Sequence, residues 1–497
     1  MKKIFKILLI LLTGATLLSV SSCTKSLDKL ANLNQNENQP LKASAATLLT
    51  AAEFSGVMAD QGGFGDGFIG IFAQHLAGTF ATGIDYNQYI IKHSDFQFLF
   101  NDAYVSSLIN LKNIINTSNL KEQGQGYVGI AQILEAYQLG YLTSIYGDIP
   151  WSQSLDIIKY PHPKYDTQID IYSQIQNLLT AGIANLDTSK AGNFVGDIIY
   201  QGDLGKWKAA GYLLKARYYN HLSKLDPQGS AKSALLMVDS AKLSGLTSDA
   251  GDFALPYDGL TASTTNPWWG SMYPNGVLGA NKVFLDIMIA QNDPRLAAYF
   301  SSVGGISGDN VYGLGKIISG TPSTNASFMS IGPDAGSFYG AVATTSVLLA
   351  SYPELLMIEA EAAIRSGNTT RAATAHNAAI TAQINTVVSL PDDMAKISKY
   401  IGTYASETPS SISLGKIMTE KHKLMFTMEV ESWMDLRRTN FMYPSFLSIP
   451  IVDENVLPTV PVAQSFIQRL LYPQSELDKN ASMVPSTSIF DKLPILK

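Results

Sequence analysis

Apolar side chains recur at intervals of three and four residues along most of the chain, and this spacing constrains the fold more than any other feature of the sequence. In residues 127–146 the repeat places an apolar stripe along one face of a helix. Residues 351–367 also carry both boundary signals, because Ser351 and Glu354 form an S-x-x-E capping box and Gly367 can end the helix. Such segments predict amphipathic helices that pack against one another.

The same spacing predicts further helices over residues 101–116, 167–186, 205–224, 230–243, 279–290, 370–386 and 414–436. The composition changes between 244 and 345, where glycine, proline, serine and threonine accumulate and the helical periodicity is lost after about residue 290. Only a few short strand pairs are expected there, near 311–318 and 338–348. The fold class is therefore mostly α: a helical-repeat scaffold that carries long irregular loop insertions.

Charged side chains in the predicted helices allow two interpretations. Glu361 and Arg365 are four residues apart and are expected to pair on the solvent face of their helix. A glycoside hydrolase needs two carboxylates across a cleft, and several carboxylates here have basic neighbours. Pairing on helix surfaces and between helices explains them more simply, so no catalytic residue is predicted. The candidates are Glu359, Glu361, Glu429, Glu431 and Asp435, with Arg437 and Arg438 beside the last of them.

The N-terminus has the layout of a secretory signal, with three lysines before a short apolar run. The small residues "VSS" precede Cys23, the only cysteine of the chain, as in a bacterial lipobox where the cysteine is lipidated. An ordinary signal peptide with an incidental cysteine is the alternative. The predicted organisation is a lipoprotein signal peptide at 1–22, a lipidated tether at 23–43, and a single domain at 44–497 with a loop-rich excursion at about 244–345.

The composition favours a neutral ligand. Charged residues make up 15% of the chain, against roughly 25% in ordinary soluble domains, and asparagine, glutamine, serine, threonine and tyrosine take their place. These side chains offer neutral donors and acceptors, which suit a hydroxyl-rich ligand better than a phosphate. The net charge of −6 provides no basic surface for a polyanion, so nucleic acid is not expected as a partner.

The sequence contains no motif for a cofactor or a metal in the structural context that such a motif requires. The stretch "GQGYVG", Gly124 to Gly129, matches G-x-G-x-x-G, but no strand is predicted before it. We therefore expect a flexible helix start there and no nucleotide site. The six histidines never occur at the spacing of a zinc site, and no G-x-S-x-G elbow is present. No cofactor, metal or catalytic site is predicted.

Two adjacent tryptophans stand in "TNPWWGSMYPNG", where proline and glycine disfavour helix and strand. An indole offers a flat face to the C–H groups of a sugar ring, while neighbouring polar side chains bind its hydroxyls. Packing of one or both tryptophans into the body is the alternative, since adjacent side chains rarely face the same way. Residues 78–89 and 332–340 also combine aromatic and polar side chains. The predicted ligand-binding residues are Trp268, Trp269, Tyr273, Asn266, Tyr86, Asn87, Tyr89, Asp85, Phe80 and Tyr339.

Several longer stretches, taken together and in order, point to one family. After the lipobox they are "YLTSIYGDIPWSQSL", "KWKAAGYLLKARYYNHLSKLDP", "NDPRLAAYF", "SYPELLMIEAEAAIRSGN", "ESWMDLRRTNFMYP" and "RLLYPQSELDKN". Over nearly its whole length the chain resembles the SusD/RagB family of outer-membrane nutrient-binding lipoproteins of Bacteroidetes.

This resemblance implies a body of tetratricopeptide-like helix pairs with an irregular loop region. It also implies a lid on a SusC-like TonB-dependent transporter, anchored by lipid to the outer membrane and facing the cell exterior. The loops around 78–90 and 261–276 occupy places comparable to those where starch-binding members carry an aromatic arc. Tyr146, Gly147, Asp148 and Pro150 are expected to close a helix-turn, and Trp433, Arg437 and Arg438 to lock the last helices.

The predicted function is therefore that of a non-catalytic binding lipoprotein that captures oligosaccharide and passes it to the transporter. Three alternatives stay open. The first is a peptide-capturing member of the same architecture, against which the scarcity of charge counts. The others are a lipid-anchored glycan hydrolase and a structural partner that only stabilises the transporter.

Overall fold

The computed structural model divides the chain into two units, Met1–Ser44 and Ala45–Lys497, and the second holds all of the elements below. The residues that it describes are 43–56, 63–78, 82–117, 124–186, 194–268, 278–300, 343–388, 394–447, 449 and 465–497. No helix within these ranges has the length and the apolar character that crossing a bilayer requires.

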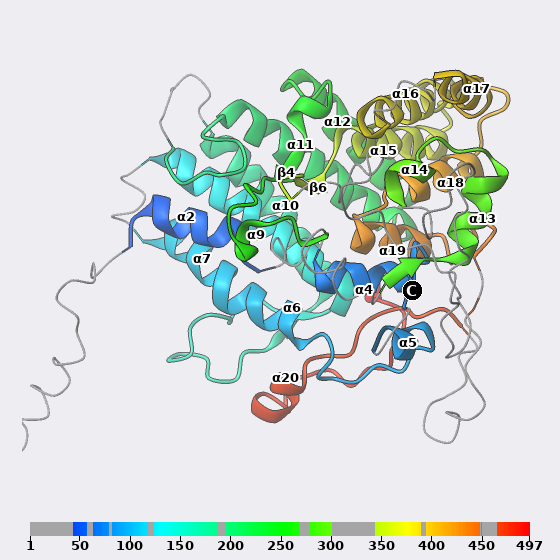
Figure 1. Ribbon diagram of the computed structural model, residues 1–497. Coiled ribbons are helices and arrows are strands. Elements are labelled where there is room, and N and C mark those ends of the chain that lie inside the picture. The colour runs from blue at the N-terminus through cyan, green and yellow to red at the C-terminus, as the bar shows by residue number, and fades with distance from the viewer. Residues whose placement is uncertain are drawn as a thin grey trace, which may run out of the picture. The chain divides into compact units, whose positions relative to one another are not determined.

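Paired helices form the body of the second unit. Each helix of the series α9 to α12, α15 and α16 packs against the next, and Figure 1 shows α11, α12, α15 and α16 side by side in colours from green to yellow. Short connections between α11 and α12 and between α15 and α16 make each pair a helical hairpin. The bounds are α9 Gln125–Tyr146, α10 Gln168–Asn185, α11 Leu204–His221, α12 Pro227–Leu243, α15 Tyr352–Arg365 and α16 Thr369–Val387. The predicted fold class, mostly α with few short strands, is confirmed.

The predicted helix boundaries agree closely where a cap is present in the sequence. Ser351 and Glu354 form the expected capping box of α15, and Gly367 follows the helix with a φ of 80°. Thr167 accepts a hydrogen bond from the Asp170 N–H at the start of α10. Helix α12 begins at Pro227, three residues before its predicted start, because the Asp226 side chain caps it by accepting from the Gly229 N–H.

One predicted helix is wrong in its continuity. Residues 414–436 form two helices, α18 (Leu414–Leu424) and α19 (Glu429–Arg438), and the chain turns between them. Thr427 in that turn has a φ of 74°, a left-handed conformation that a helix cannot contain. The predicted helix at 101–116 is also divided, into a π-helical turn (Ala103–Leu108) and α7 (Ile109–Asn116). The apolar spacing runs through both interruptions and therefore did not reveal them.

The described residues also form three antiparallel pairs of short strands. They are β1 (Leu76–Gly78) with β5 (Leu278–Ala280), β2 (Ile149–Pro150) with β3 (Tyr165–Asp166), and β4 (Phe253–Leu255) with β6 (Val347–Ala350). Strand β6 overlaps the predicted strand at 338–348, whereas 311–318 lies outside the described residues. The other helices are α2 (Ala45–Glu53), α4 (Phe64–Ala73), α5 (Thr82–Asn87), α6 (Gln97–Asp102), α13 (Lys282–Ala290), α14 (Leu296–Tyr299), α17 (Met394–Tyr404) and α20 (Gln474–Lys479).

Helix α9 is the centre of the core. The sequence predicts one apolar stripe, yet nearly every residue of this helix is buried, because α2, α7, α10, α11 and α19 all pack around it. Gly140 permits one of these contacts: a Cβ at this position would come within 2.2 Å of the Tyr218 ring on α11. A helix buried on all sides needs such small residues where a neighbour approaches most closely.

A buried ion network joins α11, α15, α18 and α19, and Glu361 is its centre. This carboxylate is only 2% exposed and accepts hydrogen bonds from both terminal nitrogens of Arg438, at 2.7 and 2.9 Å. It also accepts from Lys421 at 3.1 Å and from the Asn220 amide at 2.8 Å. The expected Glu361–Arg365 pair is present at 3.6 Å, but the prediction that it lies on the solvent face is wrong.

A second part of the network crosses between the same helices. The Arg217 guanidinium on α11 donates to both oxygens of Glu354, at 2.7 and 2.6 Å. The His221 imidazole on the same helix pairs with Glu431 of α19 at 2.8 Å. Because a buried charge is costly unless it is paired, these contacts hold the four helices in one fixed arrangement.

We predict that Glu361→Gln lowers the free energy of unfolding by about 3–5 kcal/mol, because it leaves Asp435 as the one carboxylate that pairs with the buried charges of both Arg438 and Lys421. Urea unfolding followed by circular dichroism measures the loss. The matched control is Asp239→Asn, which breaks the solvent-exposed pair with Arg371 and should cost less than about 1 kcal/mol. Equal losses in the two variants would show that the network adds nothing beyond a surface pair.

Glu53 joins the N-terminal helix α2 to the loop before α11. Its side chain is fully buried, one oxygen accepts from the Ile198 N–H at 2.7 Å, and the charge of the nearby Asp197 acts on the carboxyl. Asp197 in turn accepts from the Trp207 indole N–H at 2.7 Å. Burial, with a smaller contribution from the Asp197 charge, raises the pKa of Glu53 well above 4.5. Glu53 therefore keeps its proton to a higher pH than an exposed glutamate does.

The raised pKa of Glu53 predicts a pH dependence of stability. Because the folded pKa of Glu53 is raised, the stability that its proton contributes is complete below about pH 4.5 and is lost as the pH rises toward the folded pKa. Gln at position 53 remains neutral, so Glu53→Gln should gain stability relative to the wild type by up to about 1.4 kcal/mol per pH unit within that window. Urea unfolding of both proteins from pH 5 to 9 measures the difference. A difference that does not change with pH would contradict the raised pKa of Glu53.

Candidate ligand-binding site

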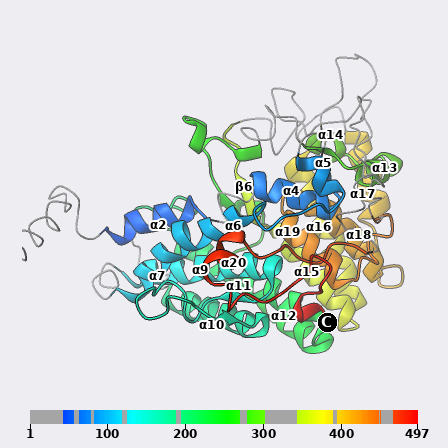
Figure 2. The ribbon, with the colours of Figure 1, turned by 90° about the horizontal axis from the view of Figure 1, so that it is seen from below.

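Strands β1 and β5 bring two of the predicted aromatic segments together. Gly78 pairs with Leu278, and Leu76 pairs with Ala280. Strand β1 ends directly before residues 79–81, and β5 begins directly after residues 269–277, so the described residues that flank these two stretches, Gly78 and Leu278, lie side by side. Figures 1 and 2 show α4, α5 and α13 near one another, away from α10 and α12. We call the region around β1 and β5 the loop junction.

Asn87 fixes the end of β1. Its side-chain oxygen accepts from the Gly78 N–H at 2.8 Å, and its amide donates to the Gly78 carbonyl at 2.8 Å. The Asn87 side chain thus makes the two hydrogen bonds to Gly78 that the backbone of a neighbouring strand would make. A Cβ on Gly78 would lie 1.9 Å from the Gly83 carbonyl oxygen, so only glycine allows α5 to approach so closely.

Asn266 binds the chain that follows residues 332–340, the third predicted aromatic segment. Its N–H donates to the Ala343 carbonyl at 2.8 Å, and its side-chain amide donates to the Thr345 carbonyl at 2.7 Å. Its side-chain oxygen accepts from the Trp268 N–H at 2.7 Å. Residues 261–268 are therefore tied to the chain that emerges from 301–342, the stretch that contains Tyr339.

The predicted ligand-binding residues fall into two groups. Tyr86, Asn87, Tyr89, Asn266 and Trp268 are buried, and Asp85 is half-buried in α5. Tyr86 packs on Phe68 and Phe96, and Tyr89 packs on Phe72. These contacts give the group packing and hydrogen-bonding roles, and their binding roles stay predictions. The other four, Phe80, Trp269, Tyr273 and Tyr339, lie outside the described residues.

Trp268 is packed into the core, with 1% of its surface exposed. Its indole N–H has no hydrogen-bond partner within the described residues. We predict that Trp268→Ala lowers the free energy of unfolding by about 3–5 kcal/mol, because it opens a cavity. Trp268→Phe should lose less, because it keeps a ring and leaves no acceptor unpaired. Urea unfolding compares the two; an unchanged stability of Trp268→Ala, with weaker oligosaccharide binding, would instead identify the indole as a ligand contact.

The carboxylates considered for hydrolysis all have partners inside the unit. Glu359 binds Arg371 and Lys242, Asp435 binds Lys421 and Arg438, and Glu429 binds His75 at 2.7 Å. The interpretation of these groups as inter-helix pairs is confirmed, although most of the pairs are buried and not on the surface. Within the described ranges, no group of three or more His, Cys, Asp or Glu side chains could hold a metal ion.

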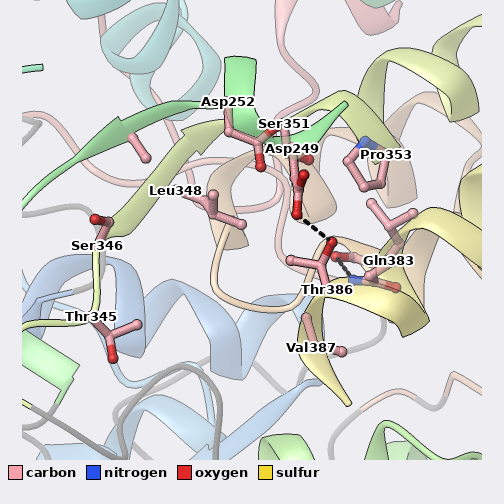
Figure 3. Close-up of a pocket in the computed structure, with 12 residues that line it drawn as sticks. Asp249, Asp252, Thr345, Ser346, Leu348, Ser351, Pro353, Gln383, Thr386 and Val387 are labelled. Carbon is pink, nitrogen blue, oxygen red and sulfur yellow. Dashed lines mark hydrogen bonds between the residues drawn. The ribbon is translucent and has the colours of Figure 1, made fainter. Parts of the chain in front are cut away.

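A separate cavity of about 310 Å³ lies between the β4–β6 strands and the end of α16. Figure 3 shows Asp249, Asp252, Ser351 and Thr386 lining it from different elements. Thr345 also lines this cavity, and its carbonyl is the group that Asn266 holds. Sequence reasoning missed these residues, because the segments that supply them are far apart along the chain and share no motif.

Comparison with known proteins gives the same family as the sequence resemblance. No protein with a curated description is significantly similar. A SusD-like family model described as "Starch-binding associating with outer membrane" matches residues 37–473.

Solved structures share the fold at low sequence identity. A chitin-binding protein is 24% identical with a TM-score of 0.71, over 88% of this chain and 95% of its own. A SusD homologue from Bacteroides fragilis is 20% identical with a TM-score of 0.73, over 92% of this chain and 100% of its own. A chitin-binding SusD homologue from Flavobacterium johnsoniae is 21% identical with a TM-score of 0.69, over 88% and 93%. Since the family model spans most of the sequence, this chain belongs to the SusD/RagB family.

Proposed function

We propose that this protein is a non-catalytic lipoprotein of the outer membrane that captures an oligosaccharide at the loop junction and passes it to a SusC-like TonB-dependent transporter. The observation that carries the proposal is the convergence of the flanks of separate aromatic segments. The strand pair brings residues 78 and 278 together, and Asn266 binds the chain at 343–345. Ligand contacts from distant parts of a sequence act together only when the fold places them side by side.

The binding surface is proposed to consist of side chains that the junction presents. Trp269 and Tyr273 lie between Trp268 and β5, Phe80 follows β1, and Tyr339 precedes the chain that Asn266 holds. Flat rings suit the C–H faces of sugars, and neutral polar side chains suit their hydroxyls. The low charge of the chain supports a neutral glycan over a peptide.

Two glycan classes are the first to test. The family model is described as starch-binding, and two of the similar structures are described as chitin-binding proteins. Both polymers consist of neutral pyranose rings, which an aromatic surface accommodates without charge. The lipid anchor is proposed at Cys23, behind the predicted signal peptide 1–22, with the tether 23–43 between anchor and domain. The proposed orientation places the domain on the cell exterior.

Isothermal titration calorimetry of the protein with maltoheptaose and with chitohexaose tests the proposal. We predict binding of one of them, and a loss of about tenfold or more in affinity for Trp269→Ala and Tyr273→Ala, because a truncated aromatic anchor removes much of the binding energy of a site. The matched control is Tyr160→Ala, which removes a half-buried aromatic ring from a turn between β2 and β3 and should leave affinity unchanged.

Three outcomes would contradict the proposal. Wild-type affinity in both loop variants would remove the junction as the site. Binding of peptides but of neither glycan would favour the peptide-capturing alternative. Release of reducing sugar from either glycan by the purified protein would contradict a non-catalytic role.

A further inference from the structure

The cavity between the β4–β6 strands and α16 is large enough for a small organic molecule. Its volume of about 310 Å³ is at the lower end of the range for ligand pockets, roughly 300–1,000 Å³. One part of the wall is apolar, with Leu348, Pro353 and Val387, and the other carries carboxylates and hydroxyls (Figure 3). A cavity with both kinds of wall suits a ligand that has a C–H face and polar groups.

The polar wall carries negative charge and no positive charge. Asp249 accepts a hydrogen bond from the Thr386 hydroxyl at 2.9 Å, and Asp252 accepts one from the Tyr352 N–H at 2.6 Å. No lysine, arginine or histidine is among the described residues that line the cavity. Arg217 is bound to both oxygens of Glu354. Within the part of the chain that the structure describes, an ionised Asp252 therefore has no side-chain counter-ion.

The end of helix α16 adds to this negative character. The helix stops at Val387, and Gln383, Thr386 and Val387 of its last turn line the cavity. The last carbonyl groups of a helix lack intrahelical partners and carry partial negative charge. The positive N-terminus of α15 lies on the other side, but Asp252 already accepts from its Tyr352 N–H. The cavity thus favours a positively charged group.

The surroundings of Asp252 disfavour the charged form of its carboxyl group. Burial raises the pKa of Asp252 to about 8, and the nearby charges of Asp249 and Glu354 add to the shift, while the hydrogen bond from Tyr352 opposes it. One oxygen of the Asp252 carboxyl accepts the Tyr352 N–H, and no hydrogen bond to its other oxygen is found within the described residues. At pH 7 the carboxyl is therefore mostly protonated, and a cationic group beside that oxygen supplies the counter-charge that favours its ionised form.

We propose that this cavity binds a small molecule with a primary ammonium group on a hydroxylated ring, such as an amino sugar with a free amine. The ammonium lies between Asp252 and Asp249. The hydroxyls of Thr345 and Ser346, which make no side-chain hydrogen bond within the described residues, bind ring hydroxyls. The apolar wall covers the C–H face of the ring. A bare metal ion fits less well, because two carboxylates in such a volume leave most of its coordination unfilled.

This site does not depend on the proposed function, although Asn266 binds the carbonyl of one lining residue, Thr345. The cavity residues come from η3 (Asp249–Gly251), β4, β6 and the two residues before it, α15, α16 and α18, and none of them is among the predicted ligand contacts. A result at one site therefore leaves the other open to its own test.

Calorimetric titration of the full-length protein with D-glucosamine, D-glucose and n-butylamine tests the proposal at pH 7. We expect glucosamine to bind and glucose to bind at least about tenfold more weakly, because glucose lacks the ammonium group. Butylamine should also bind at least tenfold more weakly, because it lacks the ring. Equal binding of glucose would overturn the role of charge, equal binding of butylamine would overturn the role of the ring, and no binding of glucosamine would overturn the site.

Two variants locate the site. Asp252→Asn keeps an acceptor for the Tyr352 N–H and removes the charge, so glucosamine affinity should fall at least about tenfold. Ser346→Phe places a bulky side chain at an exposed position of the lining and should block entry without disturbing the core. The control Asp239→Asn removes an exposed carboxylate elsewhere on the surface and should bind as the wild type does. Unchanged affinity in either cavity variant, with the fold intact by circular dichroism, would place glucosamine elsewhere and overturn the proposal.

Discussion

The pairing of buried charges around Glu361 is the constraint on which the rest of the structure depends. Helix α19 carries Asp435 and Arg438 of this network at one end, and near its start Glu429 binds His75, the residue directly before β1. The same helix also packs against α4. The charges that hold the helical body together are thus continuous, through one ten-residue helix, with the strand pair of the loop junction.

Local signals in the sequence were sufficient for the helices with caps. The boundaries of α10 and α15 follow from Thr167 and from the Ser351–Glu354 capping box, because caps act within one turn. The spacing of apolar residues did not reveal the break between α18 and α19. The break is marked by the left-handed backbone conformation of Thr427, which leaves that spacing unchanged. Strands β1 and β5 were missed for another reason: three residues are too few to show an alternating pattern.

The buried charges and the polar loop residues show where pattern reasoning stops. Glu361 and Arg365 have the spacing of a surface pair, and only the approach of Arg438 and Lys421 from distant helices turns their site into an interior one. Asn87 and Asn266 were predicted to contact ligand, yet their side-chain amides hold backbone segments at the junction. The flanks of the predicted segments pair with one another, but the individual tasks of their residues depend on contacts that no single segment contains.

The pairing of β1 with β5 has a consequence for the order of folding. Asn281, which follows β5, donates to the Leu76 carbonyl across 205 positions of sequence. Closing so long a loop is entropically unfavourable until the intervening helices are compact, so contacts of this separation form late. A partly folded chain is therefore expected to form helical pairs before the β1–β5 pair. A molecule that contacts both β1 and β5 binds only the completed fold. It therefore stabilises that state and no earlier one.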